Sequence, residues 1–214
     1  MTSQEFLSFA RQWFSLTPQQ EERFAALDAL YREWNAQINV ISRKDIDFVY
    51  EHHVLHSLAI ARYLQLEGMS LDGASVLDLG TGGGFPGIPL ALLFPSASFC
   101  LCDSVGKKTI VAQAVASSLG LENVQVVHSR AEGLPGSFDY VVSRAVASLP
   151  DFYPWVKGKF LKGILYLKGG DVNPEISAIM ARYRLAPGSI HTWKVDSWLQ
   201  DPYFEGKLVI HIEK

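Results

Sequence analysis

Residues 76–90 read VLDLGTGGGFPGIPL, and this stretch decides the fold. An apolar run over 75–79, interrupted by one carboxylate, predicts a buried β-strand. The four glycines within 80–84 allow a sharp backbone turn with no Cβ in the way. Pro86 and Pro89 suit the first turn of a following helix, where a missing N–H costs nothing. The stretch therefore predicts a strand, a tight loop whose backbone is open to a ligand, and a helix start.

A second acid indicates which ligand the loop binds. Residues 98–102 predict another apolar strand, and Asp103 follows it, where a carboxylate can accept hydrogen bonds from both hydroxyls of a ribose. Residues 82–87 match G-x-G-x-x-G, and Asp103 lies about 20 residues further on, as in dinucleotide sites. Asp78, which we place at the mouth of the pocket, would repel a pyrophosphate. It suits S-adenosylmethionine, which has an ammonium, a sulfonium and a ribose, better than NAD. A turn that binds no ligand is the alternative.

Length and composition limit the other possibilities. The chain has 214 residues, of which 48% are hydrophobic and 19% charged, as in a folded protein with a sizeable core. No apolar run approaches the ~20 residues of a membrane span, and no secretory signal precedes the first helix, so we expect a cytoplasmic protein. The net charge of −3 gives no general attraction to nucleic acid, so an RNA partner needs a local basic patch. Cys100 and Cys102, two residues apart on a strand, are expected to be core thiols.

The chain divides into two parts by its apolar spacing. Residues 1–72 show helical spacing and predict an N-terminal helical region, in which Thr17 caps a helix that starts at Pro18 and Asp45 caps a third. Residues 73–214 alternate short apolar runs with helical stretches, which predicts a Rossmann-like α/β domain with a parallel sheet.

Within the second part, the strands are predicted at 75–79, 98–102, 124–128, 139–143 and 164–168, and the helices at 86–94, 107–119, 150–160 and 174–183. Two more strand-like runs, 189–195 and 207–213, follow with no helix between them. A terminal antiparallel pair of this kind is typical of methyltransferase sheets and unusual in dehydrogenases.

Ligands of doubly wound sheets bind beyond the carboxyl ends of the strands, so the residues at those ends are site candidates. They are Asp78, Gly80, Gly82, Phe85, Asp103, Ser129, Arg130, Ala131, Glu132, Ser143, Arg144 and Lys168. A capping or solvated role is the alternative for each, above all for the lysines. Arg144 ends an apolar run and should reach into the cleft, where its donor fork suits a phosphate, a carboxylate or a guanine edge.

Four stretches, at 78–90, 103–108, 143–145 and 167–169, together resemble the bacterial small-subunit ribosomal RNA guanine-N7 methyltransferases, also called the glucose-inhibited division protein B family. In the first part of the chain, similar residues are Trp34, Asn35, Asn39, His53 and Ser57. The resemblance covers nearly the whole chain. It implies a class I S-adenosylmethionine-dependent methyltransferase sheet with a small N-terminal helical extension, and a product methylated at N7 of a guanine in 16S ribosomal RNA.

The resemblance also implies roles for individual residues. The equivalents of Gly80, Phe85, Ala131, Glu132 and Arg144 line the cofactor site. Arg144 and Lys168 are candidates for orienting the guanosine, and no single residue can be named as a chemical catalyst. The candidates for the basic patch are Arg43, Lys44, Lys107, Lys108 and Arg130. The substrate is 16S ribosomal RNA or the small ribosomal subunit, and we expect a monomer with no membrane partner.

Three positions depart from the family's pattern. Gly83 and Phe85 stand where proline and leucine are common, and Phe85 is still expected to cover the apolar side of the cofactor. His56 replaces the aspartate of a His-x-x-Asp-Ser segment. His52 and His56 have the i, i+4 spacing of metal ligands, but H-E-x-x-H is absent, so we expect no metal.

The chain lacks the motifs of other methyltransferase classes, and this agrees with methylation at guanine N7. Guanine N7 has a free lone pair, so its methylation needs no base. Amino-group methyltransferases commonly have Asp/Asn-Pro-Pro-aromatic after the fourth strand, where this chain has Ser143-Arg144-Ala145, and cytosine C5 enzymes need a cysteine nucleophile near the pocket. Two other function classes stay open: a small-molecule methyltransferase with an enclosed pocket, and a non-catalytic nucleotide or NAD module.

Overall fold

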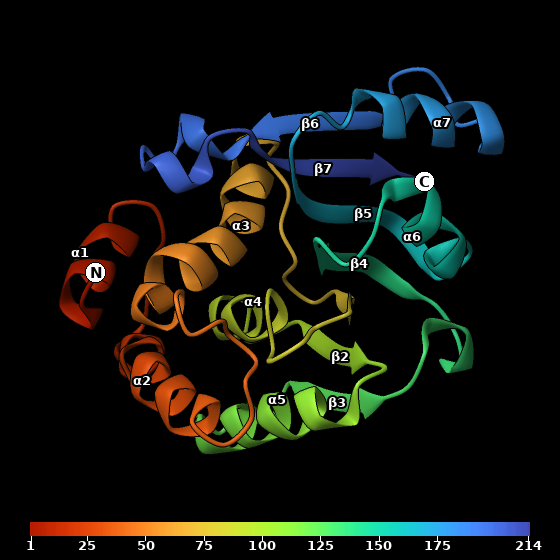
Figure 1. The fold of residues 1–214 in the computed structure, drawn as a ribbon. Helices are drawn as coiled ribbons and strands as arrows, with labels where there is room; N and C mark the ends of the chain where they lie inside the picture. Colours follow the sequence, from red (N-terminus) through yellow and green to blue (C-terminus); the bar gives the residue numbers. More distant parts are fainter.

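The computed structural model describes residues 1–214, and its centre is one seven-stranded sheet in the order β3-β2-β1-β4-β5-β7-β6 (Figure 1). The strands are β1 (Ser75–Leu79), β2 (Ser98–Asp103), β3 (Val124–His128), β4 (Phe138–Arg144), β5 (Phe160–Gly169), β6 (Ile190–Lys194) and β7 (Lys207–Glu213). Strands β1 to β5 pair in parallel, and β7 is antiparallel to both β5 and β6. The strand order reverses between β1 and β4, which is where ligands bind in such sheets.

All seven predicted strands are confirmed, and the helices that connect them are α4 (Gly87–Leu93), α5 (Gly106–Ser118), α6 (Leu149–Val156) and α7 (Asn173–Tyr183). The prediction for α6 extended to residue 160, but the helix ends earlier because Gly158 has a φ of +85° and Phe160 already pairs with Phe138. Between β3 and β4 there is only a short 3-10 helix, η3 (Ala131–Gly133). Two more, η4 (Val195–Ser197) and η5 (Pro202–Phe204), lie between β6 and β7.

The N-terminal part contains three α-helices, as its spacing predicted: α1 (Ser3–Ala10), α2 (Pro18–Asn35) and α3 (His56–Leu66). Thr17 caps α2 as predicted, because its side chain accepts a hydrogen bond from the Gln20 N–H. The capping role predicted for Asp45 is wrong. Asp45 precedes a 3-10 helix, η1 (Ile46–Phe48), which has no side-chain cap, and a π-helical segment, η2 (Val49–Leu55), follows. The Asp45 carboxylate instead binds two histidines of η2.

The hydrophobic core lies on both faces of the sheet. A cluster of 43 buried residues joins the N-terminal helices, α4 and α5 to one face, and a cluster of 17 joins α6 and α7 to the other. Figure 1 shows α1 to α3, in red and orange, apart from α6 and α7. The N-terminal helices therefore share the larger core with the sheet. None of the helices has the length and apolar character that a membrane span requires.

Candidate active site

A cavity of about 610 Å³ lies at the carboxyl ends of strands β1 to β4. Its volume is in the range of small-molecule sites. The lining residues are Leu79, Gly80, Asp103, Ser104, Val105, Lys108, Ser129, Arg130, Ala131, Glu132, Arg144, Ala145, Val146 and Trp155. The structure thus brings together the predicted residues Gly80, Asp103, Ala131, Glu132 and Arg144.

The glycine loop presents bare backbone to this cavity at Gly80. Its φ is +74°, and a Cβ at this position would lie 2.2 Å from Cγ1 of Val146. An L side chain would be strained there for both reasons. The N–H groups of Gly80 and Thr81 both donate to the Cys102 carbonyl, at 2.8 and 3.0 Å, which fixes the loop to the end of β2.

The Asp103 carboxylate lies in the cavity wall and is held by the backbone. Oδ2 accepts a hydrogen bond from the Gly82 N–H and Oδ1 one from the Val105 N–H, both at 2.8 Å. Gly82 itself therefore supports the wall and does not line it. A carboxylate oxygen has two lone pairs, so each oxygen of Asp103 can accept one further hydrogen bond. This arrangement suits a ligand with two neighbouring hydroxyls.

Asp78 does not lie at the mouth of the pocket, so that prediction is wrong. Its side chain is fully buried beneath the glycine loop, where Oδ2 accepts hydrogen bonds from Thr81 Oγ1 (2.6 Å) and the Gly87 N–H (2.8 Å). The loop folds back over the end of β1 and covers this carboxylate. Burial raises the pKa of Asp78 to about 7. Its Oδ1 is buried without a partner.

Phe85 also points away from the cavity, contrary to the prediction that it covers a ligand there. Only 3% of its surface is exposed, and its ring stacks on Tyr31 of α2 at a centroid distance of 4.6 Å. The Tyr31 hydroxyl donates a 2.9 Å hydrogen bond to the Gly83 carbonyl. Both contacts fasten the glycine loop to α2, because the loop turns its apolar side toward the N-terminal helices.

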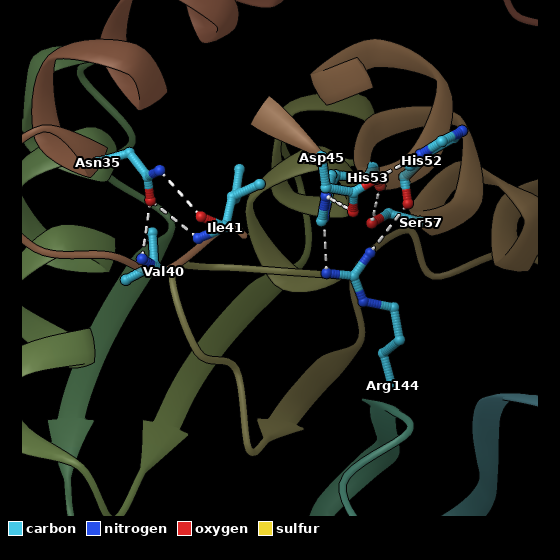
Figure 2. Close-up of polar contacts among 8 residues, drawn as sticks. All are labelled: Asn35, Val40, Ile41, Asp45, His52, His53, Ser57 and Arg144. Carbon is cyan, nitrogen blue, oxygen red and sulfur yellow. Dashed lines mark hydrogen bonds and ion pairs between the residues drawn. The ribbon is translucent and has the colours of Figure 1, made fainter. Parts of the chain in front are cut away.

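Arg144 reaches the cavity from the end of β4, as predicted. Two of its donors are already used: Nη1 donates to the His52 carbonyl at 3.2 Å, and Nη2 contacts Nδ1 of His53 at 3.0 Å (Figure 2). The guanidinium carbon lies 5.1 Å from the centre of the Phe85 ring. Burial lowers the pKa of Arg144 from its ordinary value, yet an arginine stays charged at neutral pH.

Lys168 is not brought into the cavity. Its Nζ donates to the Ala147 carbonyl at 3.0 Å and forms a 3.0 Å ion pair with Glu175 of α7. Glu175 also accepts a 2.7 Å hydrogen bond from the Leu149 N–H, at the first residue of α6. In this structure Lys168 holds the β4–α6 loop, residues 145–148, in place. A contact between Lys168 and a guanosine stays a prediction, and it would require these bonds to break.

The five candidate residues for the basic patch lie in two places. Lys108 and Arg130 line the cavity, and Lys107 is exposed beside them at the start of α5. Arg43 and Lys44 are exposed in the segment that we call the α2–η1 loop, residues 36–45.

The α2–η1 loop lies against the glycine loop. Asn35 holds it, since its Oδ1 accepts hydrogen bonds from the Val40 and Ile41 N–H groups at 2.8 and 2.9 Å (Figure 2). A Cβ built at Gly83 would lie 2.8 Å from Cγ2 of Val40.

Sequence reasoning missed several residues of the site. Val146 and Trp155 line the cavity with more than a third of their surface exposed. Their signal was position, since both follow the fourth strand. The hydrogen bonds between Asp45 and the histidines had no sequence signal beyond the resemblance, which included His53 but not Asp45.

His56 and Cys102 have packing roles. His56 is buried, touches Tyr203 and Phe204 edge-on, and both of its ring nitrogens lack partners. Burial lowers its pKa well below the ordinary value. Cys102 is a core thiol as predicted, and burial raises its pKa to about 11, whereas Cys100 is only half-buried.

The known proteins to which this chain is similar are methyltransferases. The GidB family model, described as rRNA small subunit methyltransferase G, matches residues 20–193. The ribosomal RNA small subunit methyltransferase G of Flavobacterium psychrophilum is 48% identical over 92% of each chain, and that of Flavobacterium johnsoniae is 47% identical over 92% of this chain and 93% of its own. Magnesium protoporphyrin IX methyltransferase from Synechocystis, solved with bound S-adenosylmethionine, has the same fold, with a TM-score of 0.61, 15% identity and coverage of 94% and 99% of the two chains.

Proposed function

Since this chain belongs to the rRNA small subunit methyltransferase G family, we propose that it transfers a methyl group from S-adenosylmethionine to N7 of one guanine in 16S ribosomal RNA. The family makes it an S-adenosylmethionine-dependent ribosomal RNA methyltransferase. The observation that carries the proposal is the cavity at the carboxyl ends of β1 to β4, whose wall contains Asp103, the bare backbone of Gly80 and Arg144.

The cavity residues fit S-adenosylmethionine. Gly80 leaves room where a Cβ would intrude, and each oxygen of Asp103 can accept one further hydrogen bond, from a ribose hydroxyl, besides the one from the backbone. Ala131 and Glu132 would border the adenine. The buried carboxyl of Asp78, whose pKa is raised to about 7, is partly ionised near neutral pH and then adds some negative potential behind the loop, which favours a cationic ligand end. Asp78 would act through this potential and the loop's shape, since it does not line the cavity.

S-adenosylmethionine supplies an electrophilic methyl group. Guanine N7 has an in-plane lone pair and no proton to lose, so the protein's task is to hold the base, and ~7 to 11 kcal/mol of the barrier is available from positioning alone. Arginine commonly contacts both O6 and N7 of guanine. Because N7 must stay free here, we assign Arg144 to O6 or to a phosphate of the substrate.

The substrate, location and oligomeric state belong to the same proposal. Lys107, Lys108 and Arg130 beside the cavity, with Arg43 and Lys44 on the α2–η1 loop, provide five cations for RNA phosphates, although the net charge of the chain is −3. A protein that modifies ribosomal RNA belongs in the cytoplasm, and we propose that it acts there as a monomer. Sedimentation velocity tests the monomer, and the salt dependence of RNA binding tests the cations.

The direct test measures transfer of labelled methyl from S-adenosylmethionine to 30S subunits and to naked 16S RNA, both from cells that lack this enzyme. Chemical cleavage at 7-methylguanosine locates the product. We expect label at one guanine in at least one of the two substrates, and none in 30S subunits from cells that contain the enzyme. Cofactor binding with no label in either RNA would contradict the proposal and favour a small-molecule methyltransferase.

A further inference from the structure

We propose that Asp45 and His53 are positioning residues that fix the direction of the Arg144 guanidinium at the cavity. This inference deepens the proposed function and rests on it. Asp45 is the last residue of the α2–η1 loop, His53 lies in the π-helical segment η2, and Arg144 ends β4. Three separate parts of the chain are therefore linked through His53.

The contacts form one continuous chain of hydrogen bonds (Figure 2). Arg144 Nη2 lies 3.0 Å from His53 Nδ1, and His53 Nε2 lies 2.8 Å from Asp45 Oδ2. The other carboxylate oxygen of Asp45 binds Nδ1 of His52 at 2.5 Å. Ser57 holds the backbone of this segment, because its hydroxyl donates to the His53 carbonyl at 2.6 Å.

The donors and acceptors permit a single arrangement. A guanidinium can only donate, so His53 Nδ1 must accept, and the ring proton must be on Nε2. Asp45, as a carboxylate, can only accept that proton's hydrogen bond. Asp45 therefore selects the His53 tautomer that can hold Arg144, and no other arrangement satisfies all three side chains.

The same chain keeps the guanidinium partly available to the substrate. His53 and the His52 carbonyl take two of the five N–H donors and add no negative charge. The Asp45 carboxylate does not contact Arg144 directly, because the His53 imidazole lies between them. Arg144 thus keeps N–H donors for the substrate, and no directly bonded carboxylate neutralises its positive charge.

The charged and titratable groups that face His53 are Arg144, Asp45 and His52, with His56 beyond them. Burial, and then the charge of Arg144, lowers the pKa of His53 to about 4, so the ring is neutral near pH 7. Burial opposes the charge on Asp45, but hydrogen bonds from His52 and the neighbouring imidazoles outweigh it and hold the pKa of Asp45 below its ordinary value.

The first test is Asp45→Asn, which keeps the size of the side chain but can donate to His53 Nε2. When the amide nitrogen faces His53, the ring proton moves to Nδ1, which faces the Arg144 N–H groups and cannot accept from them. We expect kcat on the RNA substrate to fall about 100-fold, as for a misplaced reacting group, while the Kd for S-adenosylmethionine changes less than about twofold. The matched control is Asp47→Asn. Asp47 lies two residues away, is exposed and pairs with Arg32, so this variant should keep wild-type activity.

Two variants of His53 separate positioning from folding. In His53→Asn the amide oxygen replaces Nδ1 as acceptor for Arg144, and in His53→Gln the amide nitrogen replaces Nε2 as donor to Asp45. We expect His53→Asn to keep most of the activity and His53→Gln to lose as much as Asp45→Asn. A role limited to packing would give equal losses in both.

Nitrogen NMR of histidine-labelled protein provides a readout that is independent of activity. We expect an Nε2–H tautomer for His53 in the wild type and an Nδ1–H tautomer in Asp45→Asn. An unchanged tautomer, or a changed tautomer with unchanged kcat, overturns the inference. A wild-type protein that methylates no RNA overturns the proposed function instead, so the two failures can be told apart.

Discussion

At the scale of single residues, Asp78 and His53 are buried titratable groups whose pKa values shift in opposite directions. Burial raises the pKa of Asp78 to about 7 and lowers that of His53 to about 4. Below about pH 6.5 the unfolded chain protonates His53 while the folded chain does not, so acid destabilises the fold through His53. Above about pH 4 the unfolded chain loses the Asp78 proton while the folded chain retains it, so rising pH destabilises the fold through Asp78.

A comparison with His53→Asn isolates the histidine contribution, because the two slopes oppose each other in the wild type. A shift of one pKa unit corresponds to ~1.4 kcal/mol. When the pH falls from about 7 to about 5, we expect the wild type to lose about 2 kcal/mol of unfolding free energy relative to the variant. Urea unfolding at the two pH values measures this. Parallel changes in both proteins would show that His53 is not held neutral by the fold.

Gly80→Ala tests whether the glycine loop must present bare backbone. The positive φ and the 2.2 Å approach to Val146 both oppose a Cβ, so we expect the affinity for S-adenosylmethionine, measured by calorimetry, to fall at least about tenfold. Gly188→Ala is the matched control. Gly188 also has a positive φ but no atom within 4 Å of the added Cβ, so the variant should lose about 1 kcal/mol of stability and keep its affinity. Equal effects of both variants on affinity would contradict the prediction.

Residue positions at strand ends were predictable, and side-chain directions were not. The rule that ligands bind at the carboxyl ends of the strands located Asp103, Ala131 and Arg144 in the cavity wall. Asp78 and Phe85 obey the same rule by position but point beneath the glycine loop. Their directions depend on how the loop folds back onto β1 and α2, which involves contacts with residues distant in sequence.

At the scale of elements, the β4–α6 loop is held in an unusual conformation. Ala145 has a φ of +48°, which a non-glycine residue rarely adopts. The Tyr166 hydroxyl accepts from the Ala147 N–H at 3.1 Å and donates to its carbonyl at 2.8 Å. Lys168 donates to the same carbonyl. These bonds from β5 fix the segment that follows Arg144 and carries Val146 into the cavity.

A double-mutant cycle tests whether Lys168 fastens this loop or binds the guanosine. If it fastens the loop, Lys168→Ala and Glu175→Ala should each lower the unfolding free energy by about 1 kcal/mol. The double variant should lose less than the sum of the two single losses, because both substitutions remove the same ion pair. Both should then lower methyl transfer similarly. Loss of methyl transfer in Lys168→Ala alone, with additive stabilities, would favour direct contact with the RNA.

The π-helical segment η2 shows why element type was less predictable than element position. The α-helical interpretation paired His52 with His56 at i, i+4, but in the structure the adjacent residues His52 and His53 both bind Asp45. Neighbouring side chains on an α-helix point about 100° apart, so they would not share one carboxylate as readily. A local change of helical turn depends on contacts with the α2–η1 loop, and apolar spacing does not record it.

At the scale of the whole molecule, the N-terminal helices form part of the sheet's own core. Polar contacts accompany the apolar packing: the Tyr63 hydroxyl of α3 lies 3.1 Å from Nδ1 of His211 in β7, and Gln20 of α2 donates to the Leu92 carbonyl of α4 at 2.8 Å. The change in apolar spacing near residue 73 lies just before the first strand, β1. It did not reveal that both parts bury one surface, because packing partners are not recorded in local periodicity.

This shared core leads to a prediction about the proposed boundary between residues 1–72 and 73–214. Expressed alone, 73–214 would expose the sheet face that the larger core covers, and both Gly83 and His211 would lose hydrogen bonds from tyrosines of the missing part. We expect this fragment to lack a cooperative thermal transition and to bind no S-adenosylmethionine, and we expect 1–72 added in trans to restore both. Differential scanning calorimetry and binding titrations measure these outcomes, with the full chain as control. A cooperatively folded fragment that binds the cofactor would show that the N-terminal helices serve the RNA and the positioning of Arg144, and that the sheet folds without them.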